Sequence, residues 1–140
     1  MEVSNLKVIS KEVLKAVDAA SEEVMHIYKS DSYEIEGKID GSPVTLADKR
    51  SHDVLSSALA SIDPNIPVLS EEGDAQDNTK SLFWLIDPLD GTKEFINKNG
   101  EFTVNVALIE EGVPILGIVS APSSTFLNSF LQKSIKLLSL

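Results

Sequence analysis

Cysteine is absent from this sequence, and basic residues are scarce in it. Without cysteine there can be no disulfide and no thiolate metal site. The chain has 12 Lys and Arg against 22 Asp and Glu, a formal net charge of −10, and this argues against nucleic-acid binding, which needs a basic surface. No apolar run is long enough to span a membrane, and Met1 to Asn5 lacks the basic start and apolar core of a signal peptide. We therefore expect a cytoplasmic protein with no integral membrane segment and no nucleic-acid partner.

The residues that are present have the composition of one soluble globular domain. The chain of 140 residues is 42% hydrophobic and 24% charged, which suffices for a single core. Apolar residues at helical spacing predict an amphipathic helix from about Asn5 to Lys29. A second helix is predicted from Thr45 to about Ser61, because the spacing of Thr45 and Asp48 resembles a capping pattern at a helix start.

Apolar runs between turn residues predict the strands. The segments Phe102–Ile109 and Val113–Ala121 are expected to form an antiparallel hairpin across Glu111-Gly112. Near the end of the chain, apolar residues from Phe126 to Ile135 are spaced as in an amphipathic helix. The fold class predicted is α+β, with two N-terminal helices packed on a largely antiparallel sheet. The other predicted strands are Tyr33–Glu36, Val68–Ser70 and Leu82–Ile86.

The strand at Leu82–Ile86 leads into Asp87-Pro88-Leu89-Asp90-Gly91-Thr92, the most informative stretch of the sequence. Pro88 disfavours helical geometry at Asp87, so a turn is expected there. Gly91 permits a close backbone approach, and Thr92 can start a helix. Carboxylates suit Mg²⁺, and N–H groups at a helix start suit phosphate. Ordinary turns use the same residue types, so the spacing alone leaves a turn and a binding site equally open.

The hexapeptide Asp87 to Thr92 resembles the first signature of the inositol monophosphatase superfamily, which contains Mg²⁺-dependent, lithium-sensitive phosphatases. The continuation Lys93-Glu94-Phe95 resembles the 3'(2'),5'-bisphosphate nucleotidase (CysQ-type) branch of that superfamily. Ser42 to Asp48 and Val68 to Glu72 also resemble segments of the family. The resemblance implies the first, N-terminal domain of the inositol monophosphatase-like fold.

The resemblance also implies roles for individual residues. Asp48 and Thr92 would be catalytic and would orient the attacking water, although on pattern alone Asp48 would be a capping carboxylate. Glu72 would lie in the outer shell of the metal, although two acidic residues after a strand are usually solvated. Backbone N–H groups of Gly91 and Thr92 would hold a phosphate oxygen. The implied ligands of Mg²⁺ are Glu71, Asp87, Leu89 through its carbonyl, and Asp90, and the implied substrate-binding residues are Glu71, Leu89, Asp90, Gly91 and Thr92.

The resemblance ends near Pro122. We therefore expect an N-terminal domain over residues 1–122 and a divergent tail over residues 123–140. Relatives continue into a second domain with a Trp-Asp signature, whereas the only tryptophan here is Trp84. The second domain is expected to be absent, which would leave an apolar domain face through which copies of the chain can associate.

Three functions are consistent with these residues. The first is a Mg²⁺-dependent phosphatase that removes the 3'-phosphate of adenosine 3',5'-bisphosphate, or of 3'-phosphoadenylyl sulfate, in sulfur assimilation; its partner is a small nucleotide bisphosphate. The second is an inositol-phosphate phosphatase of the same superfamily, which Lys93-Glu94 disfavours. The third is a truncated, catalytically weak or silent fragment that binds metal. We expect this chain to hydrolyse adenosine 3',5'-bisphosphate poorly or not at all.

Overall fold

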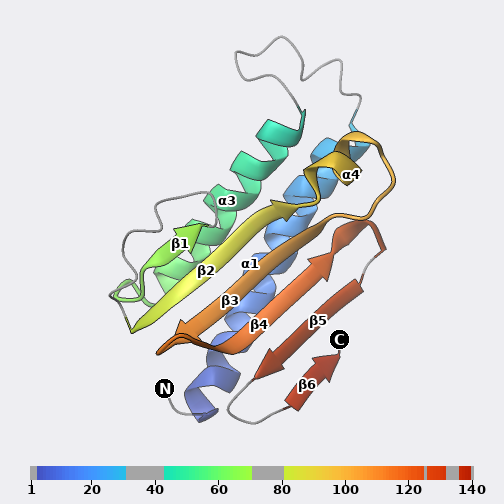
Figure 1. Cartoon of the computed structure of the whole chain (residues 1–140). Coiled ribbons are helices and arrows are strands. Elements are labelled where there is room, and N and C mark those ends of the chain that lie inside the picture. The colour runs from blue at the N-terminus through green and yellow to red at the C-terminus, as the bar shows by residue number, and fades with distance from the viewer. Residues whose placement is uncertain (1–2, 31–42, 71–80, 125, 132–135, 140) are drawn as a thin grey trace.

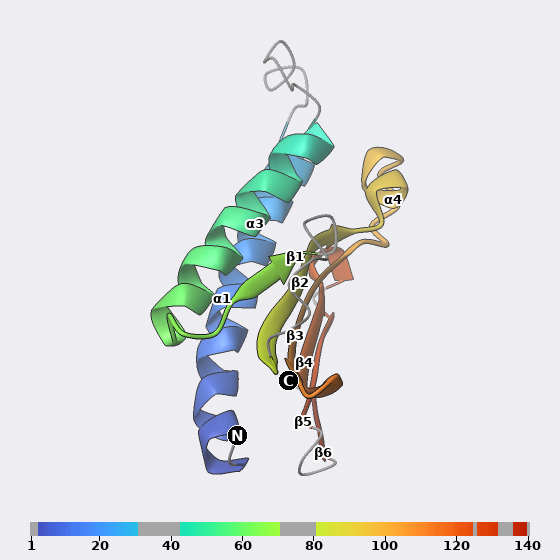
Figure 2. The same cartoon turned by 60° about the vertical axis from the view of Figure 1, so that its left-hand side comes forward.

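Two long helices pack against one face of a six-stranded sheet. The computed structural model describes residues 3–30, 43–70, 81–124, 126–131 and 136–139. The helices are α1 (Val3–Lys29) and α3 (Pro43–Ile62), and they lie side by side on the same side of the sheet (Figures 1 and 2). In the described part of the chain, neither helix is apolar over a length that could cross a membrane. The predicted α+β architecture is confirmed.

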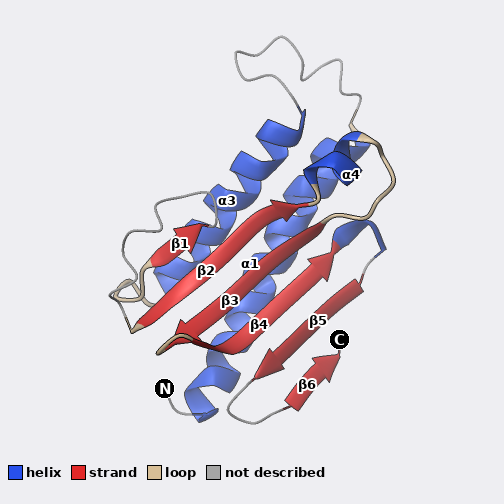
Figure 3. Cartoon of the chain, in the orientation of Figure 1, coloured by secondary structure: helices blue, strands red, loops and turns tan. Residues whose placement is uncertain are grey.

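The strands keep the order of the chain across the sheet (Figure 3). Only β1 and β2 run parallel, and every other neighbouring pair is antiparallel, so the sheet is largely antiparallel as predicted. The predicted hairpin is confirmed, and both residues of its Glu111-Gly112 turn have positive φ, 51° and 78°, as its geometry requires. The strands are β1 (Val68–Ser70), β2 (Leu82–Asp90), β3 (Thr103–Glu110), β4 (Val113–Ala121), β5 (Phe126–Leu131) and β6 (Lys136–Ser139).

The helix predicted from Phe126 to Ile135 is wrong, because its first six residues, Phe126–Leu131, form the strand β5. The backbone of β4 would present an unpaired edge without β5, and pairing along that edge overrides the helical spacing. Helix α3 begins at Pro43, two residues before the predicted start. Proline is favoured in a first helical turn, where its missing N–H has no intrahelical acceptor. The strand predicted at Tyr33–Glu36 lies outside the described residues.

The core lies between the two helices and the sheet. Ser21 on α1 and Ser120 on β4 are both buried, and their hydroxyl groups form a 3.0 Å hydrogen bond across this layer. Burial of the polar pair is tolerated because each hydroxyl satisfies the other. The largest fully buried side chains are Trp84, Phe95, Phe102, Leu6, Ile27, Leu55, Leu59, Ile86, Leu89, Leu108, Leu116 and Ile118.

An aromatic cluster ties the end of α1 to the segment after β2. The rings of Tyr28, Phe95 and Phe102 lie with centroids 4.8–5.2 Å apart. Lys98 Nζ donates a hydrogen bond to the Tyr28 carbonyl and sits 4.3 Å from the centre of the Tyr28 ring. Phe95 belongs to the short helix α4 (Thr92–Ile96), so the cluster fixes α4 against the C-terminal end of α1.

The other face of the sheet has no described helix over it (Figure 2). Alternation along β2 and β3 directs Leu85 and Ala107 to this open face, while Trp84 and Val106 are buried against the helices. Leu85 and Ala107 are half-buried. The association of chain copies through this face stays a prediction.

Candidate functional site

A β-bulge brings Asp87 and Asp90 to the same face of the sheet. Asp87 pairs with Asn105 and Asp90 pairs with Thr103, so β2 advances by three residues where β3 advances by two. Residues three apart on a regular strand point to opposite faces, and the extra residue of a bulge reverses this. Both carboxylates therefore project from the open face at the C-terminal end of β2.

The chain does not turn at Asp87, contrary to the expectation from Pro88. Strand β2 continues to Asp90 through the bulge. Proline cannot donate to a strand ladder, but a bulge has a position without a ladder bond. Pro88 and Leu89 are both buried, Leu89 to 2% exposure. Their burial on the helix side of the sheet stabilises the bulge.

Ser51 of α3 fixes this bulge directly. Its side chain is fully buried, and its hydroxyl donates a 2.8 Å hydrogen bond to the Pro88 carbonyl. The bond gives a hydrogen-bond donor to a backbone carbonyl at the irregular part of the strand, where Pro88 has no register partner on β3. It also sets the position of α3 relative to the two carboxylates.

Asp48 lies in the second turn of α3 and is half-buried. Because the helix begins at Pro43, neither Asp48 nor Thr45 stands at the helix start that the capping pattern predicted. Asp48 precedes Ser51 by three residues, so the two share one face of the helix. The N-terminal end of α3, the C-terminal end of β2 and α4 all lie at one end of the molecule (Figure 1). The structure thus places Asp48 on the side of α3 that faces the bulge.

Gly91 and Thr92 connect the bulge to α4. Gly91 is the residue before the helix and has a left-handed conformation, with φ 91°. A Cβ at this position would lie 3.0 Å from the Glu101 carbonyl oxygen, so the close approach expected of this glycine is confirmed. Thr92 begins α4, as predicted, and its side chain is exposed.

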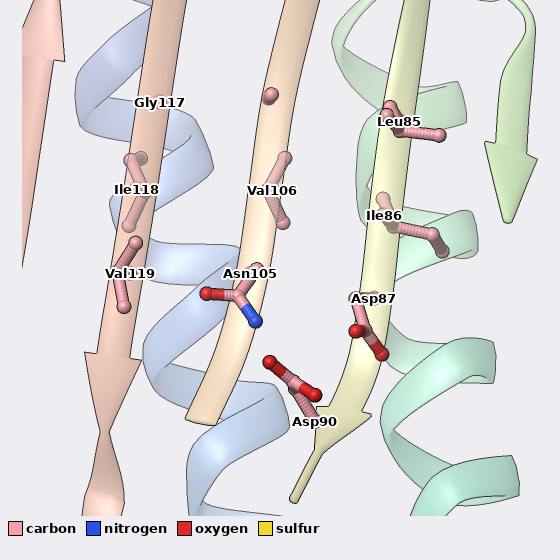
Figure 4. A pocket seen from close by; sticks show the side chains of 10 residues that line it. Leu85, Ile86, Asp87, Asp90, Asn105, Val106, Gly117, Ile118 and Val119 are labelled. Carbon is pink, nitrogen blue, oxygen red and sulfur yellow. The ribbon is translucent and has the colours of Figure 1, made fainter. Parts of the chain in front are cut away.

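The carboxylates line one end of a pocket of about 390 Å³ on the open face. In Figure 4 the carboxylate of Asp90 lies between the side chains of Asp87 and Asn105. Asn105 Nδ2 donates a 3.0 Å hydrogen bond to Thr103 Oγ1. The pocket floor continues over small residues of β3 and β4, Ala107 and Gly117, which pair with each other.

Glu71 and Glu72 lie outside the described residues. Strand β1 ends at Ser70, which pairs with Ile86, so β1 stops level with the residue before Asp87. Among the described residues, no three acidic, histidine or cysteine side chains form a group that could hold a metal ion. His26 is exposed, and His52 Nε2 lies 3.5 Å from the Ser56 hydroxyl on α3.

The donor atoms at this strand end are of the chemical type that binds a hard divalent cation. Two carboxylates on one face, with the amide of Asn105 and the hydroxyl of Thr103 on the neighbouring strand, make an oxygen-rich set, which is what Mg²⁺ requires. Both carboxylates lie in a pocket that solvent reaches, since Asp90 is exposed.

The fold and this site define the chain as a member of the inositol monophosphatase family, whose profile matches residues 5–135. It is similar to the 3'(2'),5'-bisphosphate nucleotidase CysQ of Salmonella typhimurium, with 47% identity over 116 residues, which are 80% of this chain and 47% of that protein. With CysQ of Escherichia coli K12 it shares 48% identity over 107 residues, 74% of this chain and 44% of that protein. The chain thus spans about half the length of these curated relatives.

Solved structures of inositol monophosphatase family proteins also match this chain. A crystal structure of CysQ from Bacteroides thetaiotaomicron matches with a TM-score of 0.80 and 36% identity, over 95% of this chain and 49% of that one. The inositol monophosphatase of Anabaena matches with a TM-score of 0.79 and 25% identity, over 96% of this chain and 47% of that one. The resemblance seen in the sequence is confirmed.

Sequence reasoning missed three residues of this region: Ser51, Thr103 and Asn105. Asn105 could have been found from the sequence, because it is a polar residue in the middle of the apolar strand 102–109. No comparable signal existed for Ser51, because serine inside a helix has the same local pattern whether it is buried or exposed.

Proposed function

We propose that this domain provides the metal- and phosphate-binding half of a Mg²⁺-dependent phosphatase that hydrolyses the 3'-phosphate of adenosine 3',5'-bisphosphate and of 3'-phosphoadenylyl sulfate, in sulfur assimilation. The main support is the bulge, which brings Asp87 and Asp90 together in a chain 47% identical to a protein named as a bisphosphate nucleotidase. Lys93-Glu94 favours this substrate over inositol phosphate.

The carboxylates of Asp87 and Asp90 and the Leu89 carbonyl would hold Mg²⁺ together with Glu71. The end of β1 level with Ile86 supports the inclusion of Glu71, the next residue in the chain. When bound, Mg²⁺ neutralises charge on the phosphoryl oxygens and makes water a stronger nucleophile. The two aspartates would set the position of the substrate phosphate through the ion.

Asp48 and Thr92 would orient the attacking water. The Asp48 carboxylate would accept a hydrogen bond from that water, and the Thr92 hydroxyl would hold its other side. This role requires the two side chains to lie within reach of one water molecule, and it is supported by the shared face of Asp48 and Ser51 and by the contact between α3 and α4. The N–H groups of Gly91 and Thr92 would bind a phosphate oxygen.

Calorimetric titration of the 140-residue chain with Mn²⁺ and Mg²⁺ tests the metal site. We expect Asp87→Asn and Asp90→Asn each to weaken binding at least about tenfold, because each removes a charged ligand. Asp53→Asn, which alters an exposed aspartate of α3, serves as the matched control and should bind like the wild type. Equal binding by all four proteins would refute the site.

A substrate panel tests the chemistry. Phosphate release is measured with Mg²⁺ from adenosine 3',5'-bisphosphate and from inositol 1-phosphate, with and without lithium. We expect faster, lithium-sensitive release from the nucleotide. The absolute rate should be low, because the matched relative is about twice as long as this chain and its additional residues can contribute to the reaction. Preference for inositol 1-phosphate would instead support the second candidate function.

A further inference from the structure

Thr103 and Asn105 lie directly across β3 from the two aspartates of the proposed metal site. Asn105 is the register partner of Asp87, and Thr103 is the register partner of Asp90. Cross-strand partners in an antiparallel pair place their side chains on the same face, within contact range. Both residues are half-buried. The bulge therefore gives each carboxylate a polar neighbour on the adjacent strand.

The two polar residues are already linked to each other. Asn105 Nδ2 donates to Thr103 Oγ1 at 3.0 Å, so the hydroxyl oxygen accepts from the amide. A hydroxyl has one proton of its own to donate, and the register partner of Thr103 on the neighbouring strand is Asp90, whose carboxylate can accept it. Figure 4 shows that carboxylate lying between the side chains of Asp87 and Asn105.

We propose that Thr103 and Asn105 are positioning residues that orient the Asp90 carboxylate for cation binding, through the chain Asn105 Nδ2–H to Thr103 Oγ1 and Thr103 O–H to Asp90. The inference rests on the proposed function, since it assigns these residues to the same metal site. Carboxylate ligands are commonly held by hydrogen bonds from a surrounding shell, and the loss of such a partner typically weakens metal binding by about 10–100-fold.

Threonine at position 103 allows a sharp test. Thr103→Val removes the hydroxyl while it keeps the shape and the preference for a strand, and Thr103→Ser keeps the hydroxyl. We expect Thr103→Val to weaken Mn²⁺ binding about tenfold, and Thr103→Ser to bind within about twofold of the wild type. Asn105→Leu, which removes the donor to Thr103, should weaken binding in the same direction. Affinities are measured by calorimetry on the 140-residue chain.

Urea unfolding of the metal-free variants separates positioning from general structure. We expect Thr103→Val to unfold at the same urea concentration as the wild type, since valine suits the strand. Loss of affinity with unchanged stability supports the proposal. Wild-type affinity in Thr103→Val and Asn105→Leu, together with weak binding by Asp90→Asn, would overturn the positioning role and leave the metal site intact. Wild-type affinity in Asp90→Asn as well would overturn the proposed function itself.

Discussion

The hydroxyl of Ser51 lies 2.8 Å from the carbonyl oxygen of Pro88, and this one bond joins the helix that carries Asp48 to the bulge that carries Asp87 and Asp90. The two groups of the proposed mechanism, the water-orienting acid and the metal-binding pair, come from elements far apart in the sequence. Their relative position therefore depends on a buried contact between α3 and β2.

Ser51→Ala should destabilise the fold. The substitution leaves the buried Pro88 carbonyl without its donor, and an unsatisfied buried acceptor costs about 1–3 kcal/mol. The free energy of unfolding, measured in urea, is expected to fall by that amount. Ser57→Ala alters an exposed serine of the same helix and should change stability by less than about 0.5 kcal/mol. Similar values for the two variants would mean that the bond contributes nothing.

Gly91→Ala should destabilise the chain more than Gly112→Ala. Both glycines have positive φ, 91° and 78°, and this conformation costs an alanine about 1–2 kcal/mol. At Gly91 the new Cβ would also lie 3.2 Å from Phe102 Cα, whereas nothing lies within 4 Å at Gly112. Thermal unfolding of both variants gives the comparison, and an equal loss of stability would rule out the steric contribution at Gly91.

Lys98→Met should loosen the attachment of α4 to α1. It removes the hydrogen bond to the Tyr28 carbonyl and the contact with the Tyr28 ring. An exposed cation–π contact is worth about 0.5–1 kcal/mol, and a hydrogen bond to a charged group adds to it, so a loss of about 1–2 kcal/mol in unfolding free energy is expected. Lys93→Met, at another exposed lysine near the site, is the control, and it should retain wild-type stability.

Mn²⁺ should stabilise the wild-type chain but not Asp90→Asn. A ligand that binds only the folded state at 100 times its dissociation constant adds about 2.7 kcal/mol of stability. The increase should appear in urea unfolding with and without Mn²⁺. In the absence of metal, Asp90→Asn is expected to be at least as stable as the wild type, since it removes one of two like charges from the strand end. Equal Mn²⁺ stabilisation of both proteins would exclude Asp90 as a ligand.

In a complete enzyme that contains this domain, Thr92→Ala should lower phosphate release more than it lowers Mn²⁺ affinity. Thr92 is proposed to orient water, so its loss affects the reaction rather than the binding of the ion. Rate and affinity are measured on the same preparation. A parallel fall in the two would assign Thr92 to the metal instead, and a structure with Asp48 and Thr92 beyond the reach of one water would contradict the pair.

Local sequence was sufficient to locate β2, α4 and the hairpin, because each has its own pattern of apolar and turn residues. It was insufficient for the bulge, since Pro88 has the same local signature in a turn and in an irregular strand. Only the pairing of Asp87 with Asn105 and of Asp90 with Thr103 distinguishes the two. The mistaken helix near Phe126 has the same origin, because its strand depends on the distant edge of β4.

The hydrogen bond between Ser21 and Ser120 spans 99 positions of sequence, which has a consequence during synthesis on the ribosome. Helix α1 is made first, but the part of the sheet that covers it at Ser120 emerges only after β2 and β3. At about 5–20 residues per second, that interval lasts about 5–20 s. Throughout it the apolar side of α1, which includes Val17 and Val24, lacks β4, the strand that it contacts most, and is partly open to chaperones or to neighbouring nascent chains.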